Sequence, residues 1–299
     1  MSRVRANLLL LLAGAIWGMG FVAQSTAMAA IGPMLFIGLR FIASTVAIAP
    51  FALREYRRAD TPVPREAWRQ FAFVGLLLFS AMTAQQYGLL TTSVTNSGFL
   101  TGLYVVMTPF LAVALMRQWP HWIVWPAALA CVAGIFLLSG GQLDRLVAGD
   151  WLTVLCALFN ALQLIYLGRT VMRFGLPVTL AVTQFAICAV LGLAAAFAFE
   201  PVDFAAIGAA LPEIVYTGVF SGGVAFTLQA IAQRHTTAAQ AAIFLSSEAV
   251  FAALFAALFL HERLPGVALA GCGLIFAAIL AVEVVPALAT RGRQPQQNG

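Results

Sequence analysis

The sequence predicts an all-α integral membrane protein in which ten transmembrane helices form two inverted five-helix repeats, with both termini cytoplasmic. Three observations lead to this fold class. The chain of 299 residues is 62% hydrophobic and 9% charged, whereas an ordinary soluble domain is about a quarter charged. Apolar runs of membrane-spanning length recur along it, and its two halves resemble each other at a shift of about 143 residues.

Ten apolar runs are long enough to cross a bilayer, whose core of roughly 30 Å requires about 20 helical residues. Polar, glycine-containing or proline-containing breaks separate them. The first run follows Arg3 and Arg5 as a secretory signal would, but it continues past Gln24, so we interpret it as the first span. The predicted spans cover approximately residues 6–28, 34–53, 70–90, 94–116, 123–140, 150–169, 177–199, 212–233, 237–260 and 265–285.

The arginines orient these spans, because positive residues in short loops favour the cytoplasmic side. The chain contains no lysine, and all sixteen of its positive side chains are arginines. With the amino terminus inside, thirteen arginines fall in inside segments and only Arg145 and Arg263 in outside loops, while Arg40 lies within the second span. This asymmetry predicts that both ends of the chain are cytoplasmic.

The internal repeat divides the chain into two halves of five spans each. A shift of 143 sets residues 73–75 against residues 216–218, and Gln86 against Gln229. Because five is an odd number, the second half must cross the membrane in the opposite direction. Inverted repeats are typical of secondary transporters, which bind substrate near the midplane between the halves. The predicted units are a first repeat over residues 1–145, a second, inverted repeat over residues 146–286, and a cytoplasmic polar tail over residues 287–299.

Four stretches of sequence carry a resemblance to a known family. They are AIWGMGF in span one, GLRFIAS in span two, TTSVTNSGFLTGLYVVMTPFLAVAL in span four and FLSSEAVFAALFAALFLHERL in span nine. With them the chain resembles the drug/metabolite transporter superfamily in its ten-helix EamA-type branch, to which YddG-like amino-acid exporters belong. The resemblance covers almost the whole chain. It implies a central cavity lined by spans one to four and six to nine, with spans five and ten peripheral.

Polar and aromatic side chains at helical spacing predict which residues face such a cavity. In span four, Thr101, Tyr104 and Thr108 form a polar stripe, and a repeat shift of 140 makes Glu248 of span nine the counterpart of Thr108. Amides in hydrocarbon must be paired or hydrated, so each amide either joins helices or lines a wet cavity. Each aromatic ring taken alone is explained better by packing or by a lipid-facing position. The candidate cavity residues are Trp17, Gln24, Thr83, Gln86, Thr101, Tyr104, Asn160, Gln163, Tyr166, Phe244 and Glu248.

Two strongly ionisable residues lie well inside the predicted spans, where charge is costly and usually functional. Glu248 has three open interpretations: a neutral structural hydrogen-bonding acid, a residue that binds a substrate ammonium or lines the pathway, or a carboxylate that couples proton movement to transport. Arg40 either binds a substrate carboxylate or anchors span two. Pro109 stands in span four where span nine has Ala249, which makes it a candidate hinge.

The remaining motifs exclude other classes of protein. No GxxxxGK[ST] loop occurs, so ATP-driven transport by this chain alone lacks support. The histidines lie at predicted loop edges without HExxH spacing, and the cysteines lie in apolar runs without CxxC spacing. We therefore predict no enzyme, no metal site and no cofactor, and no nucleic acid as partner.

The polar lining predicts the kind of solute. Amides and hydroxyls beside aromatic rings suit a zwitterionic or neutral amphipathic molecule. Together with the resemblance, this predicts secondary export of small metabolites such as amino acids, aromatic or hydrophobic ones included, by alternating access in a bacterial-type inner membrane. Protons are a candidate coupling ion. The open alternatives are a flippase for a lipid-linked substrate and a drug exporter of the same fold.

Overall fold

The residues that the computed structural model describes form an all-helical bundle without strands. Eight helical segments are long and apolar enough to cross a membrane, and Val124–Leu138 is a shorter apolar helix. The predicted all-α membrane fold is confirmed. Arg145 and Arg263, which the sequence assigns to outside loops, lie outside the described part of the chain. The described residues are 1–28, 30–59, 62–92, 94–140, 147–259 and 265–291.

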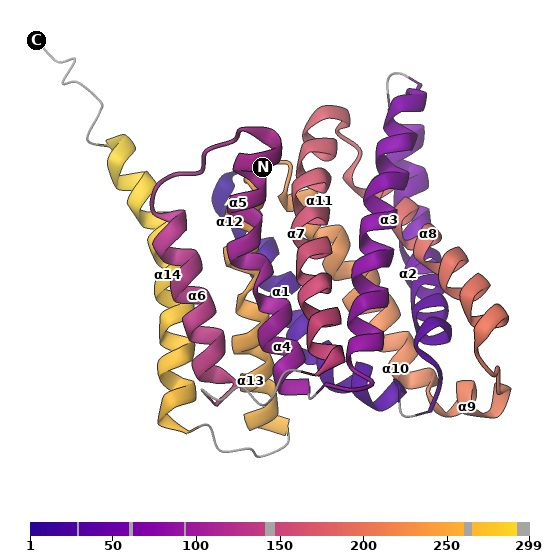
Figure 1. Ribbon diagram of the computed structural model, residues 1–299. Coiled ribbons are helices and arrows are strands. Elements are labelled where there is room, and N and C mark those ends of the chain that lie inside the picture. Colours follow the sequence, from indigo (N-terminus) through magenta and orange to yellow (C-terminus); the bar gives the residue numbers. More distant parts are fainter. Residues whose placement is uncertain (29, 60–61, 93, 141–146, 260–264, 292–299) are drawn as a thin grey trace, which may run out of the picture.

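The first half of the chain forms five long helical units that run side by side through the bundle (Figure 1). The second unit starts at Pro33, whose fixed φ suits the first turn of a helix. The fourth unit is interrupted at Leu103. Its helices are α1 (Arg3–Met28), α2 (Pro33–Arg57), α3 (Arg65–Gly88), α4 (Val94–Gly102), α5 (Tyr104–Met116) and α6 (Val124–Leu138).

The second half repeats this plan with two differences. A short helix precedes the eighth unit, and the middle of that unit is a π-helix, η1, in which each N–H bonds five residues back. The ninth unit is interrupted at Ser246. The helices are α7 (Ala148–Phe174), α8 (Pro177–Phe199), α9 (Phe204–Ala209), α10 (Leu211–Val215), η1 (Tyr216–Ala225), α11 (Phe226–Ala232), α12 (Ala238–Leu245), α13 (Ser247–Phe259) and α14 (Gly266–Arg291).

The two interruptions correct the repeat register that the sequence suggests for spans four and nine. Leu103 and Ser246 are 143 residues apart, the same shift as elsewhere in the chain. Glu248 is therefore the counterpart of Val105 and not of Thr108. The shift of 140 differs from 143 by three residues, which is nearly one helical turn. The shift of 140 therefore compares residues on the same face of the two helices, but these residues lie about one helical turn apart along the helix axis.

Helices α2 and α8, the second members of the two repeats, cap each other reciprocally. Glu200 follows the last residue of α8 and accepts hydrogen bonds from the backbone N–H groups of Met34 (2.8 Å) and Leu35 (2.9 Å) at the start of α2. Glu55 in the last turns of α2 accepts from the N–H of Thr179 (2.7 Å) at the start of α8. Each carboxylate thus satisfies N–H groups that a helix start leaves unpaired. This reciprocal capping requires α2 and α8 to run antiparallel, as inverted repeats predict.

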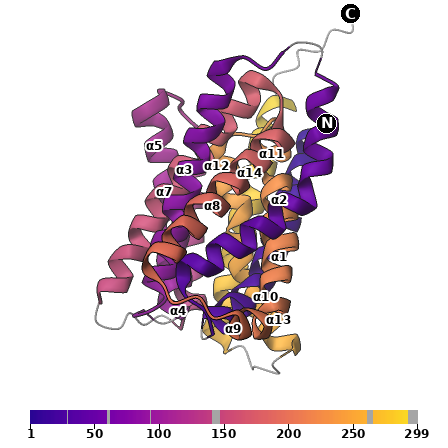
Figure 2. The same cartoon turned by 90° about the vertical axis from the view of Figure 1, so that its right-hand side faces the viewer.

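The same two helices cross at a pair of glycines. A Cβ on Gly192 of α8 would lie 2.8 Å from the backbone nitrogen of Gly38 in α2, closer than real Cβ contacts allow. Only glycine permits this approach between the backbones. Figure 2 shows α2 and α8 next to each other on the side of the bundle that faces the viewer.

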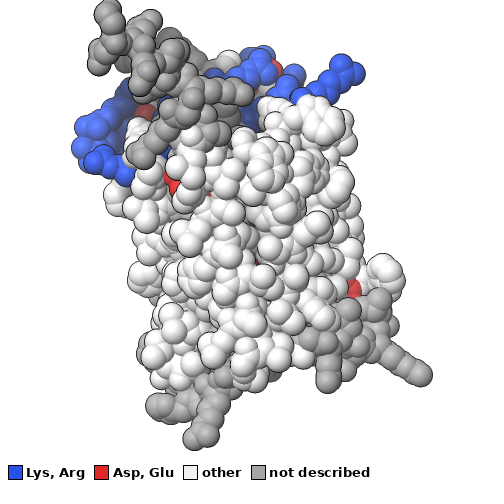
Figure 3. All heavy atoms as spheres, turned by 90° about the vertical axis from the view of Figure 1, so that its left-hand side faces the viewer, with Lys and Arg blue, Asp and Glu red and all other residues white. Residues whose placement is uncertain are grey.

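The ends and the edge of the bundle match the predicted topology. Helices α6 and α14 pack on each other at one edge, as the family resemblance implies for spans five and ten (Figure 1). Helix α1 begins and α14 ends at the same end, whereas α9 lies at the other (Figures 1 and 2). Arginines gather at the end where α1 begins and α14 ends, above a largely uncharged surface (Figure 3). We call this the arginine-rich end; the positive-inside rule predicts that it is cytoplasmic. Helix α14 continues to Arg291, five residues into the predicted polar tail.

Candidate functional site

A polar cavity lies at the centre of the bundle, between the two repeats. It has about 80 Å³ of room for the centres of water-sized molecules, whereas one water needs roughly 10–15 Å³ on this measure. The cavity is therefore large enough to be hydrated. Its lining residues are Trp17, Gly20, Gln24, Arg40, Met82, Gln85, Thr101, Tyr104, Asn160, Gln163, Leu164, Ser221, Phe226, Gln229, Leu245 and Glu248.

The structure brings most of the candidate residues to this cavity. Both ionisable candidates, Arg40 and Glu248, border it, so Glu248 faces the interior of the bundle. The polar and aromatic candidates that join them are Trp17, Gln24, Thr101, Tyr104, Asn160 and Gln163.

Four other candidates do not border the cavity. Gln86 lies behind Gln24 and donates a 2.8 Å hydrogen bond to its side-chain oxygen. Tyr166 packs edge-on against Phe73, with ring centroids 4.9 Å apart. Phe244 is buried in a hydrophobic core and Thr83 is half-buried on α3.

Pro109, the candidate hinge, is buried inside α5, where its ring removes one backbone hydrogen bond of the helix. It does not border the cavity. Its function as a hinge stays a prediction.

The lining also includes residues that were not among the candidates. Gln85, not its neighbour Gln86, borders the cavity from α3, because adjacent positions differ by about 100° around a helix. Gln229 borders it from α11. Ser221 contributes from the π-helix, whose altered hydrogen bonding turns its side chains away from α-helical periodicity.

Arg40 is held deep in the bundle without an acidic partner among the described residues. Only 3% of it is exposed, and its Nη1 donates a 2.6 Å hydrogen bond to Oε1 of Gln24. The guanidinium also lies over the rings of Phe41 and Phe36, at 5.0 and 5.5 Å from the centroids. Its Nε has no hydrogen-bond partner in the described chain. A buried guanidinium with a free donor can bind an anionic group of a ligand.

Two clusters of buried side chains, one from each repeat, flank the cavity in the same pattern. In the first, Gln24 of span one accepts hydrogen bonds from Arg40 of span two and Gln86 of span three. In the second, the amide of Gln163 bonds the corresponding residues of spans seven and eight. It donates to Gln184 at 3.0 Å and accepts from Gln229 at 3.2 Å. Helices α2 and α8 start at Pro33 and Pro177, which are 144 residues apart, so Gln184 is the counterpart of Arg40. The second repeat therefore has the neutral Gln184 where the first has the charged Arg40.

Glu248 lies in the first turn of α13, immediately after the interruption at Ser246. Its position is fixed by close contact with α1, since a Cβ on Gly18 would lie 2.6 Å from the Glu248 carbonyl oxygen. The side chain is half-buried, and no described residue forms an ion pair with it. A carboxylate in this position is favoured by the helix dipole and is free to accept from a cationic ligand.

Trp17 connects the two sides of the cavity. Its indole N–H donates a 2.8 Å hydrogen bond to the Ser221 carbonyl, and its ring lies 4.7 Å from that of Phe226. It packs against both hydrophobic cores of the protein: one built mainly from α4–α6 and α12–α14, the other mainly from α2, α3 and α8. The cavity therefore lies at the boundary between two separately packed groups of helices.

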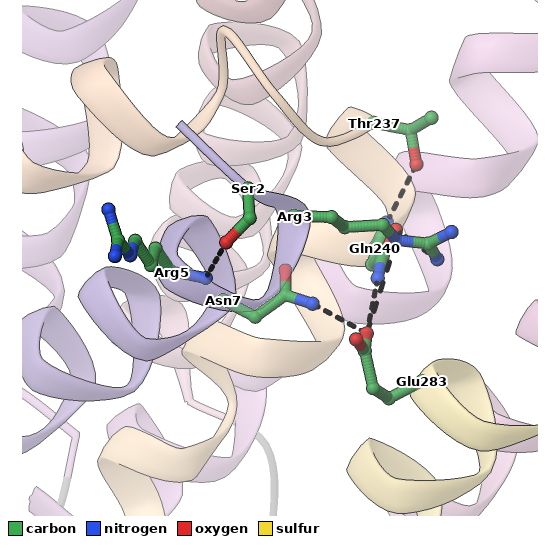
Figure 4. Close-up of polar contacts among 7 residues, drawn as sticks. All are labelled: Ser2, Arg3, Arg5, Asn7, Thr237, Gln240 and Glu283. Carbon is green, nitrogen blue, oxygen red and sulfur yellow. Dashed lines mark hydrogen bonds and ion pairs between the residues drawn. The ribbon is translucent and has the colours of Figure 1, made fainter. Parts of the chain in front are cut away.

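A polar cluster near the arginine-rich end ties α1, α12 and α14 together (Figure 4). Glu283 of α14 accepts hydrogen bonds from Asn7 (2.6 Å) and Gln240 (3.3 Å), and Arg3 donates to Gln240 at 2.8 Å. The Arg3 Nε lies 4.0 Å from the Glu283 carboxylate. This cluster joins the first span to the last two at one end of the molecule.

Comparison with known proteins agrees with this architecture. The model of the EamA-like transporter family matches the chain twice, over residues 4–140 and 147–283. An uncharacterized transporter from Archaeoglobus fulgidus is 29% identical over 295 residues, covering 95% of this chain and 87% of that protein. A crystal structure with 18% sequence identity superposes with a TM-score of 0.81 over 95% of this chain and 99% of the other, which shows a shared fold. Because the two family matches together span most of its length, the chain belongs to the EamA-like transporter family and is a membrane transporter.

Proposed function

We propose that this transporter exports a small zwitterionic metabolite, an amino acid, through the central cavity. The observation that carries the proposal is that Arg40 and Glu248 border the same cavity, while no described residue forms an ion pair with either of them. Charges buried in a bilayer protein normally pair. A ligand with one carboxylate and one ammonium would supply the two missing partners.

Arg40 suits the carboxylate end of this ligand. A guanidinium presents a planar set of donors that matches a carboxylate, and its charge persists at any physiological pH. The hydrogen bond to Gln24 and the two phenylalanine rings hold the group in one orientation. Binding would therefore cost little further loss of side-chain entropy. The same contacts also anchor span two, so both interpretations of Arg40 from the sequence apply to one side chain.

Glu248 suits the ammonium end, and it would bind a proton when the ammonium leaves. A carboxylate in a low-dielectric cavity is costly to leave charged and unpaired, so loss of the substrate cation favours uptake of a proton. Ammonium and proton would then compete for one side chain. This competition is the simplest means by which proton entry could drive substrate release.

Movement between the two hydrophobic cores would give alternating access. The cavity lies where these cores meet, and Trp17 contacts both. Rocking of one group of helices against the other would open the cavity first to one end and then to the other, as in other inverted-repeat transporters. The arginine distribution supports a cytoplasmic position of the arginine-rich end, and the family resemblance favours export across a bacterial-type inner membrane.

Exchange in proteoliposomes tests this proposal. Vesicles that contain the purified protein and are loaded with unlabelled amino acid should accumulate the labelled amino acid from outside, faster than protein-free vesicles. A panel should include small, branched, aromatic, acidic and basic amino acids. The proposal is wrong if correctly folded protein exchanges none of them. Flux of a fluorescent lipid-linked sugar or of a cationic dye by the same vesicles would instead favour a flippase or a drug exporter.

A further inference from the structure

A second hollow adjoins the central cavity, and Glu248 borders both. It lies between α4, α6 and α13 and has about 190 Å³ of room for the centres of water-sized molecules, more than the central cavity. We call it the side chamber. Its other lining residues are Gly98, Gly102, Ile135, Leu138, Ser139, Ser246, Ala249, Ala252 and Ala253.

The side chamber is apolar apart from Glu248. Its two hydroxyl groups are already used within their own helices: Ser139 donates to the Ile135 carbonyl at 2.9 Å, and Ser246 donates to the Ile243 carbonyl at 2.6 Å. The rest of the lining is glycine, alanine, isoleucine and leucine. The chamber therefore suits a hydrocarbon group and offers a polar ligand only the carboxylate that it shares with the central cavity.

We propose that the side chamber receives the apolar side chain of the transported amino acid; this inference rests on the proposed function. In an α-amino acid, the ammonium nitrogen and the side chain are attached to the same carbon atom. When the ammonium is at Glu248, the side chain begins within two bonds of the boundary between the two hollows. The polar cavity then holds the charged head group, and the chamber holds the side chain. The chamber thereby selects branched or aromatic substrates.

Small residues create the space in which this selection takes place. A Cβ added to Gly98 would meet no atom within 4 Å, so a larger residue fits there without moving the backbone and fills part of the chamber. Leu138, on the facing helix α6, borders the chamber with a large side chain that can be shortened. The two positions therefore allow opposite changes in chamber size.

The test compares exchange of phenylalanine with exchange of alanine in proteoliposomes. Gly98→Val should lower the ratio of phenylalanine to alanine exchange roughly tenfold or more, because even one methylene changes discrimination in an apolar pocket about 10–200-fold. Leu138→Ala should move preference toward bulkier side chains such as that of tryptophan. Gly273→Val is the matched control: Gly273 lies in α14, is exposed, and also has open space around its Cβ. It should leave the ratio unchanged.

The outcomes separate this inference from the proposed function. If the wild-type protein exchanges both amino acids but Gly98→Val and Leu138→Ala leave the ratio at its wild-type value, the chamber does not hold the side chain of the substrate. If the wild-type protein exchanges no amino acid, the proposed function is wrong and the inference falls with it. If Gly98→Val fails to fold, Leu138→Ala still tests the inference in the opposite direction.

Discussion

Arg40 of the first repeat and Glu248 of the second border one central cavity without forming an ion pair with each other. The Arg40 guanidinium is oriented by its hydrogen bond to Gln24 and by two phenylalanine rings. The Glu248 backbone is positioned by the close approach of α1 at Gly18. The guanidinium therefore has a defined orientation, and the backbone that carries the carboxylate has a defined position. This arrangement differs from a structural salt bridge, in which the charges would neutralise each other directly.

Arg40→Gln should reduce amino-acid exchange while preserving the fold. The second repeat has glutamine at the equivalent position, Gln184, where it bonds Gln163 at 3.0 Å, so glutamine is compatible with this location. A hydrogen bond to a charged group contributes about 1.5–3 kcal/mol, which corresponds to a roughly tenfold to hundredfold loss of substrate affinity. The measurement is the concentration of amino acid that gives half-maximal exchange. An unchanged value would mean that Arg40 only anchors span two.

Glu248→Gln should separate proton coupling from exchange. Glutamine keeps the size of the side chain but carries no titratable proton, so an imposed pH gradient should no longer drive uptake in vesicles. Exchange between equal amino-acid pools should weaken, because the ammonium loses its counter-charge. Full gradient-driven uptake by this variant would end the coupling hypothesis for Glu248. Retained uptake together with weaker exchange would identify it as a substrate-binding residue alone.

Removal of either reciprocal helix cap should destabilise the protein. Glu55→Ala and Glu200→Ala each leave N–H groups at a helix start without an acceptor, at a cost of about 0.5–2 kcal/mol. The effects should add, because the two sites lie at opposite ends of α2. Unfolding in mixed detergent micelles measures them.

Glu66→Ala is the matched control for the caps. It removes an exposed ion pair with Arg173, and such pairs contribute about 0.2–1 kcal/mol. Equal destabilisation by the control and by the two cap variants would show that the capping hydrogen bonds stabilise the protein no more than an exposed ion pair does.

Gly192→Val should separate α2 from α8. The new Cβ would lie 2.8 Å from the Gly38 nitrogen, and backbone cannot move aside as a flexible side chain can. Overpacking of this kind typically costs about 1–3 kcal/mol. The melting temperature in detergent should fall relative to that of Gly273→Val, whose added side chain is exposed. Equal melting temperatures would contradict the observed crossing of the two helices.

Much of the fold could be predicted because a bilayer imposes simple rules on a sequence. Span length, arginine distribution and the match between the two halves can all be read along the sequence, and they predicted the helices, their orientation and the inverted repeat. The contacts that align the repeats could not be predicted in this way. In the sequence, Glu55 and Glu200 are acidic residues near the ends of spans, and nothing shows that each reaches the start of the other's helix.

The sequence pattern predicted the candidate site only in part, because helical spacing gives only approximately the direction in which a side chain points around the helix axis. The pattern selected Glu248, which borders the cavity, but it also selected Gln86, whereas Gln85 is the residue that borders the cavity from α3. It also could not anticipate the π-helix that brings Ser221 to the lining. The side chamber could not be predicted from the sequence, because glycine and alanine at helical spacing indicate close helix packing as readily as they indicate a hollow.

The central claim is that Arg40 binds the carboxylate and Glu248 the ammonium of one substrate. Its most direct test is competition against labelled phenylalanine exchange by phenylethylamine, which lacks the carboxylate, and by phenylpropionate, which lacks the ammonium. In the wild-type protein both should compete at least roughly tenfold more weakly than phenylalanine, since each loses one charged hydrogen bond. Arg40→Gln should abolish the disadvantage of phenylethylamine alone, and Glu248→Gln that of phenylpropionate alone. If both variants preserve the full wild-type preference for the zwitterion, the two residues do not bind the substrate's charged groups.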